Sequence, residues 1–344
     1  MAVRDRRPRG VVTVPSIPLS DLRKQVGELR PTVEGLVIER GKIAEFARSI
    51  GCETSVFYDR EAAVDAGYPD IPAPLTFTRT AYFPRALTEG VDPPQFGMDL
   101  GFDPERTVHG EQAYEYDRPI VAGDTLDATT GLTDVYTKSG SGGKILTFAE
   151  LETVYTDADD ERVLTERRTR IERGEPEEET SEDGGHNETG KDDTATDGGE
   201  DCRTTAGGHE PGVPEDLPVI GTTLPRFDVK AVSRRDIVRY LGASGDFNPL
   251  HYDDAFARRG GHESVVVPGM YVAGVASAAL TDWVPLRCIR RFRTRFVSVV
   301  YPGNDLTVTG EATAVDHDAS TVTVDFTVEN AGRNVVVGAA TLGR

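Results

Sequence analysis

The sequence contains an internal repeat, and this repeat constrains the fold more than any other feature of the chain. Residues 40–75 align without a gap on residues 234–269 at a constant offset of 194. The matched positions include a shared framework of glycine and proline: Gly51 with Gly245, Gly67 with Gly261, and Pro74 with Pro268. A chain of 344 residues is long enough for two domains of ordinary size. We therefore expect two domains built on one plan.

The two copies differ at two polar positions. The second copy has Asp246 and His251, whereas the first has Cys52 and Phe57 at the aligned positions. If these side chains served only to hold the loop, both copies would need them. The difference favours a functional role for Asp246 and His251.

Asp246 and His251 lie five residues apart on a segment that reads as a loop, because Asn248 is a turn former and Pro249 restricts the residue before it. A carboxylate and an imidazole on one loop can both reach a single water molecule. One group can then abstract a proton while the other donates, which is the minimal apparatus for adding or removing water. The alternative is that Asp and Asn are turn residues and His251 is a satisfied interior histidine.

The segment GDFNPLHYDDAFA, followed by VVVPGMYVAG, resembles the signature of the MaoC-like (R)-specific enoyl-CoA hydratases and 3-hydroxyacyl-thioester dehydratases. The first copy, with APLTF and the later VHGEQAYEYDRPIVAGDTL, resembles the degenerate N-terminal domain that often precedes a catalytic one in that family. The resemblance implies an α+β fold class. Two hot-dog domains, each an antiparallel sheet wrapped around a central helix, would form a pseudo-dimeric double hot-dog.

The resemblance also implies that Asp246 and His251 are the catalytic pair in the reversible hydration of a 2-enoyl-CoA to an (R)-3-hydroxyacyl-CoA. CoA is then part of the substrate, and we expect no cofactor. A mesaconyl-CoA-type substrate, which is branched and dicarboxylic, is an alternative. A thioesterase and a non-catalytic acyl-CoA-binding protein are further alternatives. The sequence leaves open the acyl chain, the physiological direction and which of the two groups is the acid.

Four further residues are candidates for substrate binding. Gly269 and Met270 stand where a helix is expected to begin, and first-turn amides there lack partners within the helix. We expect the Gly269 amide to hold the negative charge that develops on the thioester oxygen. Asn248 would order the loop or bind the water, and Phe57 would line an acyl tunnel.

Residues 175–210 divide the chain. They contain thirteen acidic residues against Lys191 and Arg203, and no Val, Ile, Leu, Met or aromatic residue. Such a segment buries too little apolar area to offset its ordering entropy. We expect four parts: a flexible tail (1–29), a non-catalytic hot-dog domain (30–173), an acidic disordered linker (174–215) and a catalytic hot-dog domain (216–344).

Hydrophobic periodicity and turn residues predict the elements of each domain. Ser233 is a predicted N-cap. Helices are expected over 22–29, 41–50, 61–66, 75–87, 234–241, 255–259 and 269–283. Strands are expected over 112–116, 125–136, 145–155, 163–171, 288–300, 306–315, 321–328 and 334–342.

The net charge is −20, from 58 acidic and 38 basic residues, of which only six are lysine. This balance argues against nucleic-acid and anionic-membrane partners, and it raises the hypothesis of a protein from a salt-rich cytoplasm. An anionic CoA would then need local basic residues. Period-two alternation places Arg291, Arg293 and Arg295 on one face of the strand predicted over 288–300. These three arginines would either contact the phosphates of CoA or form a solvated face.

The three cysteines and six histidines are dispersed and show no metal-ligand spacing. The N-terminus has no apolar core of signal-peptide length, and no run reaches the roughly 20 apolar residues of a membrane span. We expect a cytoplasmic enzyme of fatty acid metabolism. Its partner would be an acyl-CoA thioester, and it would act as a monomeric pseudo-dimer or a homodimer of that unit.

Overall fold

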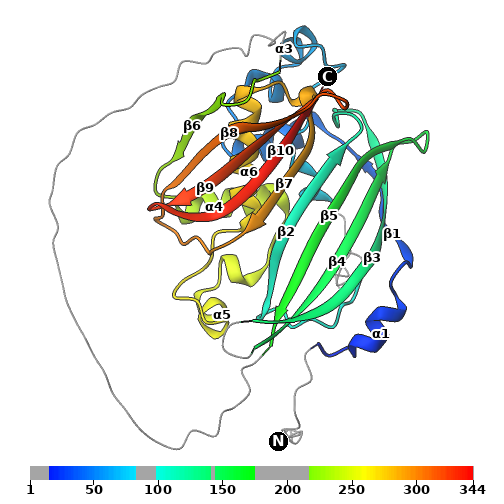
Figure 1. The fold of residues 1–344 in the computed structure, drawn as a ribbon, viewed down its shortest axis with the longest axis vertical. Coiled ribbons are helices and arrows are strands. Elements are labelled where there is room, and N and C mark those ends of the chain that lie inside the picture. The colour runs from blue at the N-terminus through cyan, green and yellow to red at the C-terminus, as the bar shows by residue number, and fades with distance from the viewer. Residues whose placement is uncertain (1–14, 83–97, 141–143, 175–216, 344) are drawn as a thin grey trace, which may run out of the picture.

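A computed structural model describes residues 15–82, 98–140, 144–174 and 217–343. All its named strands belong to one antiparallel sheet of ten, in the order β1-β3-β4-β5-β2-β7-β10-β9-β8-β6. The first domain contributes the first five and the second domain the last five, so the domains join where β2 pairs with β7 (Figure 1). The strands are β1 (Leu29–Val37), β2 (Thr107–Tyr116), β3 (Thr125–Ser139), β4 (Ile145–Thr156), β5 (Arg162–Arg173), β6 (Thr223–Val229), β7 (Ile289–Phe296), β8 (Leu306–Asp316), β9 (Thr321–Asn330) and β10 (Arg333–Gly343).

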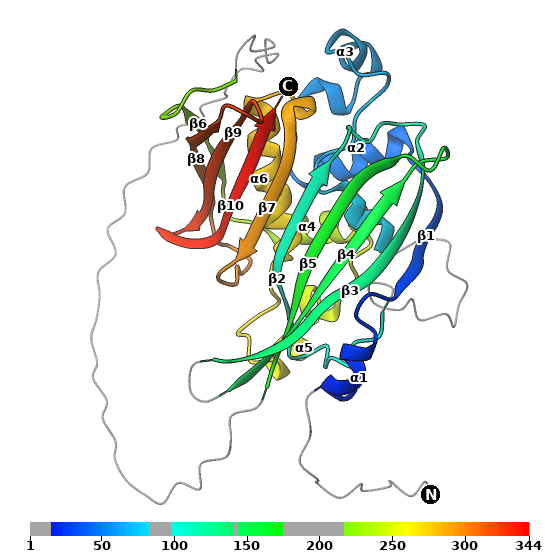
Figure 2. The ribbon, with the colours of Figure 1, turned by 45° about the vertical axis from the view of Figure 1, so that its right-hand side comes forward.

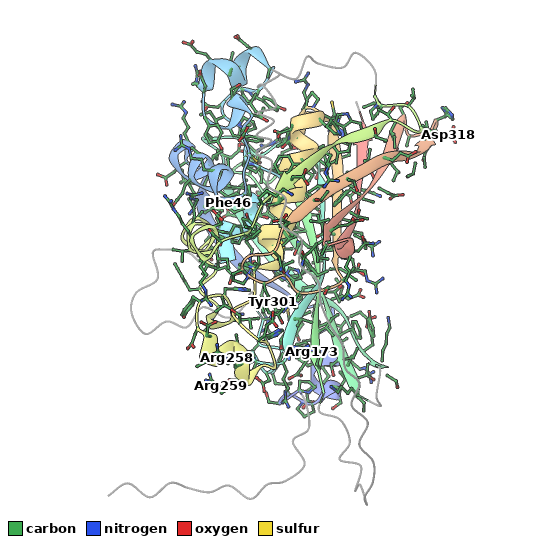
Figure 3. The ribbon with its side chains drawn as sticks, turned by 90° about the vertical axis from the view of Figure 1, so that its left-hand side faces the viewer. Phe46, Arg173, Arg258, Arg259, Tyr301 and Asp318 are labelled. Atoms are coloured by element: carbon green, nitrogen blue, oxygen red, sulfur yellow. The ribbon has the colours of Figure 1, made fainter. Side chains whose placement is uncertain are left out.

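The longer helices lie together on one face of this sheet (Figures 2 and 3). The α-helices are α1 (Leu19–Lys24), α2 (Arg40–Ser49), α3 (Arg60–Asp65), α4 (Arg234–Ser244), α5 (Asp254–Arg259) and α6 (Gly269–Trp283). The 3-10 helices are η1 (Ser55–Phe57), η2 (Phe77–Tyr82), η5 (Pro249–His251) and η6 (Leu286–Cys288). The arrangement confirms the predicted double hot-dog, with α6 as the central helix of the second domain.

The repeat is visible in the backbone of both halves. Helices α2 and α4 occupy equivalent places and contact one another, and η1 and η5 follow them at the same distance along the chain. Phe46 of α2 lies in the helical layer (Figure 3). Its ring centroid is 5.6 Å from that of Phe77 and 6.0 Å from that of Tyr240. One aromatic cluster therefore joins the two domains.

The central segment of the first domain differs from the prediction. A helix was expected over residues 75–87, but the described part forms the 3-10 helix η2 (Phe77–Tyr82), and residues 83–87 lie outside the described residues. Thr76, Thr78 and Thr80 alternate along this segment, and β-branched residues are poor α-helix formers.

The prediction also missed both edge strands of the sheet, β1 and β6. Each pairs on one side only, and each pairing contains a register shift, so neither shows a regular period-two pattern. The short helix expected over 22–29 lies earlier in the chain, as α1 (Leu19–Lys24) with Leu22 fully buried, and Leu29 already begins β1. The predicted disordered linker falls almost entirely on residues 175–216, outside the described residues.

Candidate active site

Helix α4 delivers the chain to the candidate site. It begins with the predicted cap, since Ser233 and Asp236 form a capping box. It ends at Gly245, whose φ of 75° lies in the left-handed region that glycine adopts without a Cβ penalty. The chain therefore turns sharply just before Asp246, whose side chain points into the protein and is buried.

Asn248 orders the next turn of the loop. Its Oδ1 accepts a hydrogen bond from the Leu250 amide at 3.0 Å and caps η5, which carries His251. The backbone N–H of Asn248 donates to Asp246 Oδ1 at 3.4 Å. Of the two roles expected for Asn248, the described contacts match the ordering of the loop.

The tautomer of His251 follows from its contact with the backbone. Its Nδ1 lies 2.8 Å from the carbonyl oxygen of Val266, which accepts only, so Nδ1 carries the hydrogen. In the neutral ring Nε2 is then an acceptor. Burial lowers the pKa of His251, and the charge of Asp246 opposes this only in part. The ring is therefore mainly neutral at pH 7.

The carboxylate of Asp246 is paired with a residue of the other domain. Arg79 Nη2 donates to Asp246 Oδ2 at 2.7 Å, and the two side chains are only 7% and 6% exposed. Burial would raise the pKa of Asp246, but the charge of Arg79, the charge that His251 gains when it is protonated in acid, and the hydrogen bond from Arg79 outweigh it and lower the pKa to about 2. Asp246 is ionised at neutral pH, and its interaction with His251 indicates that the two groups share one site.

Sequence reasoning missed Arg79, which lies 167 residues before Asp246. One signal was present. An arginine stands in a segment whose neighbours Phe77 and Ala81 were expected to be buried, and a buried charge needs a partner.

Gly269 and Met270 begin α6 after Pro268, as predicted. A Cβ at Gly269 would lie 3.1 Å from the Phe296 ring, so the ring would have to shift by a few tenths of an ångström to admit a larger residue. Met270 is buried. The oxyanion role of the Gly269 amide and the contact of Met270 with substrate stay predictions.

Phe57 lies at the position equivalent to His251 and is fully buried in the hydrophobic core. Its part in an acyl tunnel stays a prediction. A cleft of about 470 Å³ has Ser244 and Gly245, which lie just before Asp246, as part of its wall. The rest of that wall comes from the first domain, chiefly β1, Lys42, Phe77, Thr80 and Ala81.

A group of basic residues from the first domain lies close to Arg79. Burial, Arg79 and Arg168 lower the pKa of Arg170 to about 9, whereas Asp246 raises it. His109 lies near the same three arginines, and burial is the main cause of its lowered pKa. Its ring centroid is 5.1 Å from that of Phe296, the residue that covers Gly269. Basic groups therefore surround the site on the side of the first domain.

The three arginines considered for CoA phosphates lie elsewhere. Arg291 pairs with Glu115 at 3.0 Å, and Arg293 and Arg295 both pair with Glu111. All three are more than 60% exposed. They join β7 to β2 across the domain junction, which favours the alternative of a solvated face.

Within the described residues, no cluster of three or more His, Cys, Asp or Glu side chains could hold a metal ion. None of the helices described is long and apolar enough to cross a membrane.

The ten-stranded sheet and the single Asp–His loop define a class: two fused hot-dog domains with an Asp–His loop in only one of them. Comparison with known families gives the same division of the chain. The FAS1-like, dehydratase domain region matches residues 24–166, and the MaoC like domain matches residues 217–333. The chain belongs to the MaoC-like double hot-dog proteins.

Individual relatives agree with this assignment. A UPF0336 protein from Clavibacter michiganensis is 36% identical over 149 residues, which cover 43% of this chain and 93% of the relative. A solved MaoC-like dehydratase superposes with a TM-score of 0.70 at 26% identity, covering 94% of this chain and 99% of its own. A Mycobacterium tuberculosis protein with a double hot-dog fold superposes with a TM-score of 0.62 at 16% identity, covering 94% and 97%, and this likeness concerns the fold alone.

Proposed function

We propose that this protein catalyses the reversible hydration of a 2-enoyl-CoA to an (R)-3-hydroxyacyl-CoA. The observation that carries the proposal is the loop on which the buried Asp246 is ionised and His251 has an unprotonated Nε2. Two acceptors on one loop suit a water molecule, which has two hydrogens to donate. The similarity to a MaoC-like dehydratase over nearly the whole chain supports the same reaction class.

The proposed reaction adds the water oxygen to the β-carbon of the enoyl group. As the C–O bond forms, the π electrons move toward the thioester oxygen, and the Gly269 amide at the start of α6 stabilises this charge. One of the two acceptors, Asp246 or His251, takes the proton released by the water. A proton then returns to the α-carbon, which completes the addition, and dehydration is the reverse.

A crotonyl-CoA assay, followed by the loss of the enone absorbance, tests this proposal. We expect turnover by the wild type and a loss of about 100-fold or more in Asp246→Asn and in His251→Ala, the range for general acid–base groups. His262→Ala is the matched control, because His262 lies beside Tyr301 and outside the loop. Full activity in both loop variants would refute the catalytic assignment, and binding without turnover by the wild type would favour a non-catalytic acyl-CoA-binding protein.

A branched dicarboxylic acyl-CoA of the mesaconyl type is a second candidate substrate. The basic residues on the side of the first domain favour it, because the charge of Arg170 would attract a distal carboxylate and disfavour a long apolar chain. The same assay with both thioesters separates the candidates. A higher kcat/KM for mesaconyl-CoA, reduced selectively by Arg170→Met, would support the dicarboxylic substrate.

We further propose that one chain is a complete catalytic unit, since β2–β7 pairing already joins two hot-dog domains into one sheet. A cytoplasmic location and a role in fatty acid metabolism would accompany this activity.

A further inference from the structure

We propose that Arg79, supplied by the non-catalytic domain, is a positioning residue that keeps the Asp246 carboxylate ionised and oriented for catalysis. The catalytic part of this inference rests on the proposed function, whereas the pairing of the two side chains does not depend on it. Arg79 Nη2 and Asp246 Oδ2 are 2.7 Å apart, and both side chains are almost completely removed from solvent. A contact this short between buried charges fixes the carboxylate in place.

The need for a cation follows from burial. A carboxylate moved out of water tends to gain a proton unless a positive charge compensates it. His251 cannot supply that charge at pH 7, because burial lowers its own pKa and leaves the ring neutral. Arg79 remains charged under all ordinary conditions. It is therefore the residue best able to hold Asp246 in its ionised form.

Several elements hold Arg79 in place from the first domain. Its neighbour Thr78 donates to Glu166 Oε2 at 3.1 Å, and Gln112 Nε2 donates to Glu166 Oε1 at 2.8 Å. One residue before Thr78, Phe77 packs edge-on against Phe46. This support fixes the short η2 segment between β5 and α2, so the position of the guanidinium is set by the fold of the first domain.

The repeat gives an independent argument. At the offset of 194, Arg79 falls on Ala273, just as Cys52 falls on Asp246. The pair Arg79 and Asp246 therefore has the pseudo-symmetric counterpart Ala273 and Cys52, both buried. The arginine and the carboxylate are both present in the pair Arg79–Asp246, and both are absent from the equivalent pair Ala273–Cys52. The arginine therefore accompanies the carboxylate and does not belong to the framework that the two copies share.

Other ionisable groups also face Asp246 and enter the expected pH dependence. They come from η5, β5 and α4: His251, Arg170 and Tyr240. Arg170 would partly replace the charge lost with Arg79, whereas Tyr240 stays neutral because burial raises its pKa. Removal of Arg79 should therefore shift the titration of Asp246 upward.

The test compares Arg79→Met, Arg79→Lys and the control Arg40→Met, which removes an exposed arginine that pairs with Asp70. In Arg79→Met we expect kcat at pH 7 to fall about 10-fold or more with little change in KM, and the acid limb of the kcat profile to move to higher pH. Arg79→Lys keeps the charge and should recover part of both effects. In an Asp246→Asn background Arg79→Met should cause little further loss. An unmoved acid limb in Arg79→Met would overturn the proposal, and so would equal profiles for the Met and Lys variants.

A second readout separates this inference from the proposed reaction. A carbon-13 NMR titration of the Asp246 carboxylate reports its pKa without any substrate. The wild-type pKa is expected near 2, and in Arg79→Met it should rise above the ordinary aspartate value of about 3.9. The lysine variant, which is the milder change for folding, should lie between the two. An Asp246 pKa that stays near 2 in both variants would overturn the proposal even if the enzyme proves active. A raised pKa would uphold the pairing even if no enoyl-CoA is turned over.

Discussion

Gly245 and Asn248 set the backbone of the loop that carries Asp246. Gly245 adopts a φ of 75°, and the first copy keeps this feature, because Gly51 has a φ of 80°. Asn248 has no such counterpart: Thr54 stands in its place and donates to Asp282 at 2.5 Å. The left-handed turn thus belongs to the repeated framework, whereas the side-chain cap was specialised in the copy with the acid–base pair.

The hydrogen bond by which Asn248 caps η5 leads to a prediction for a single residue. Asn248→Ala removes the Oδ1 that accepts from the Leu250 amide, and we expect a loss of about 1 kcal/mol in the free energy of unfolding, typical of a lost N-cap. Activity should fall too, because η5 carries His251. Asn248→Ser retains an acceptor and should stay close to the wild type. Urea unfolding and the crotonyl-CoA assay measure both effects, and an Asn248→Ala protein of unchanged stability would contradict the role of the cap.

Local sequence patterns predict features within one loop, but they do not predict contacts between distant segments. The Ser233 cap depends on residues within a few positions of it, and Asp246 and His251 were singled out by the turn residues around them together with the comparison with the first copy of the repeat. Arg79 could not be paired with Asp246, since no local pattern links residues 167 positions apart. The fold alone brings η2 to the end of α4.

At the scale of elements, α6 shows why a helix of small residues lies at the centre of the second domain. Small side chains such as Ala273 and Ala276 let a curved sheet wrap closely around this helix. The structure adds a second reason, because a Cβ at Gly274 would lie 2.5 Å from Cγ2 of Ile50, at the end of α2. Gly274 thus allows the helical layers of the two domains to touch. Pro268 and the run of small residues after it identified α6, whereas β1 and β6 were missed because edge strands with register shifts lack a regular pattern.

This contact predicts an unusual response to alanine. Gly→Ala within a helix normally stabilises by up to about 1 kcal/mol, but Gly274→Ala should destabilise, because overpacking costs about 1–3 kcal/mol. Gly242→Ala in α4 is the matched control, since a Cβ there meets none of the described atoms within 4 Å. Urea unfolding should show opposite signs for the two variants.

An Ile50→Ala background provides the control for mechanism. It removes the Cγ2 that the new methyl group would meet at 2.5 Å and leaves the Cβ at 3.1 Å, so Gly274→Ala should destabilise the protein much less there. If Gly274→Ala instead stabilised the wild-type background as Gly242→Ala does, the close approach of α6 and α2 would be refuted.

At the scale of the whole molecule, the domains share one sheet and one core. The main hydrophobic cluster includes Phe46 and Leu126 of the first domain as well as Leu280 and Phe326 of the second. The exposed ion pairs of Arg291, Arg293 and Arg295 with Glu111 and Glu115 lie over the β2–β7 junction. Such pairs contribute only about 0–1 kcal/mol each, so backbone pairing and the shared core hold the halves together.

The net charge of −20 then becomes the dominant electrostatic feature of the molecule. Like charges in excess repel one another in the compact state, and salt weakens that repulsion as the Debye length shortens from about 10 Å at 0.1 M to about 3 Å at 1 M. Salt also screens the surface pairs, but these contribute little individually. We therefore expect the thermal midpoint at pH 7 to rise as KCl increases over this range, in line with the hypothesis of a salt-adapted protein.

A comparison between two pH values distinguishes charge screening from a general effect of salt on apolar surface. Near the isoelectric point of about 4.7 the net charge is close to zero, so screening of repulsion should contribute almost nothing there. The rise in the midpoint with KCl should be clear at pH 7 and small near pH 5, as measured by differential scanning calorimetry. An equal rise at both values would assign the effect to apolar burial. A fall at pH 7 would mean that the attractive pairs outweigh the repulsion, and the salt-adaptation hypothesis would then be wrong.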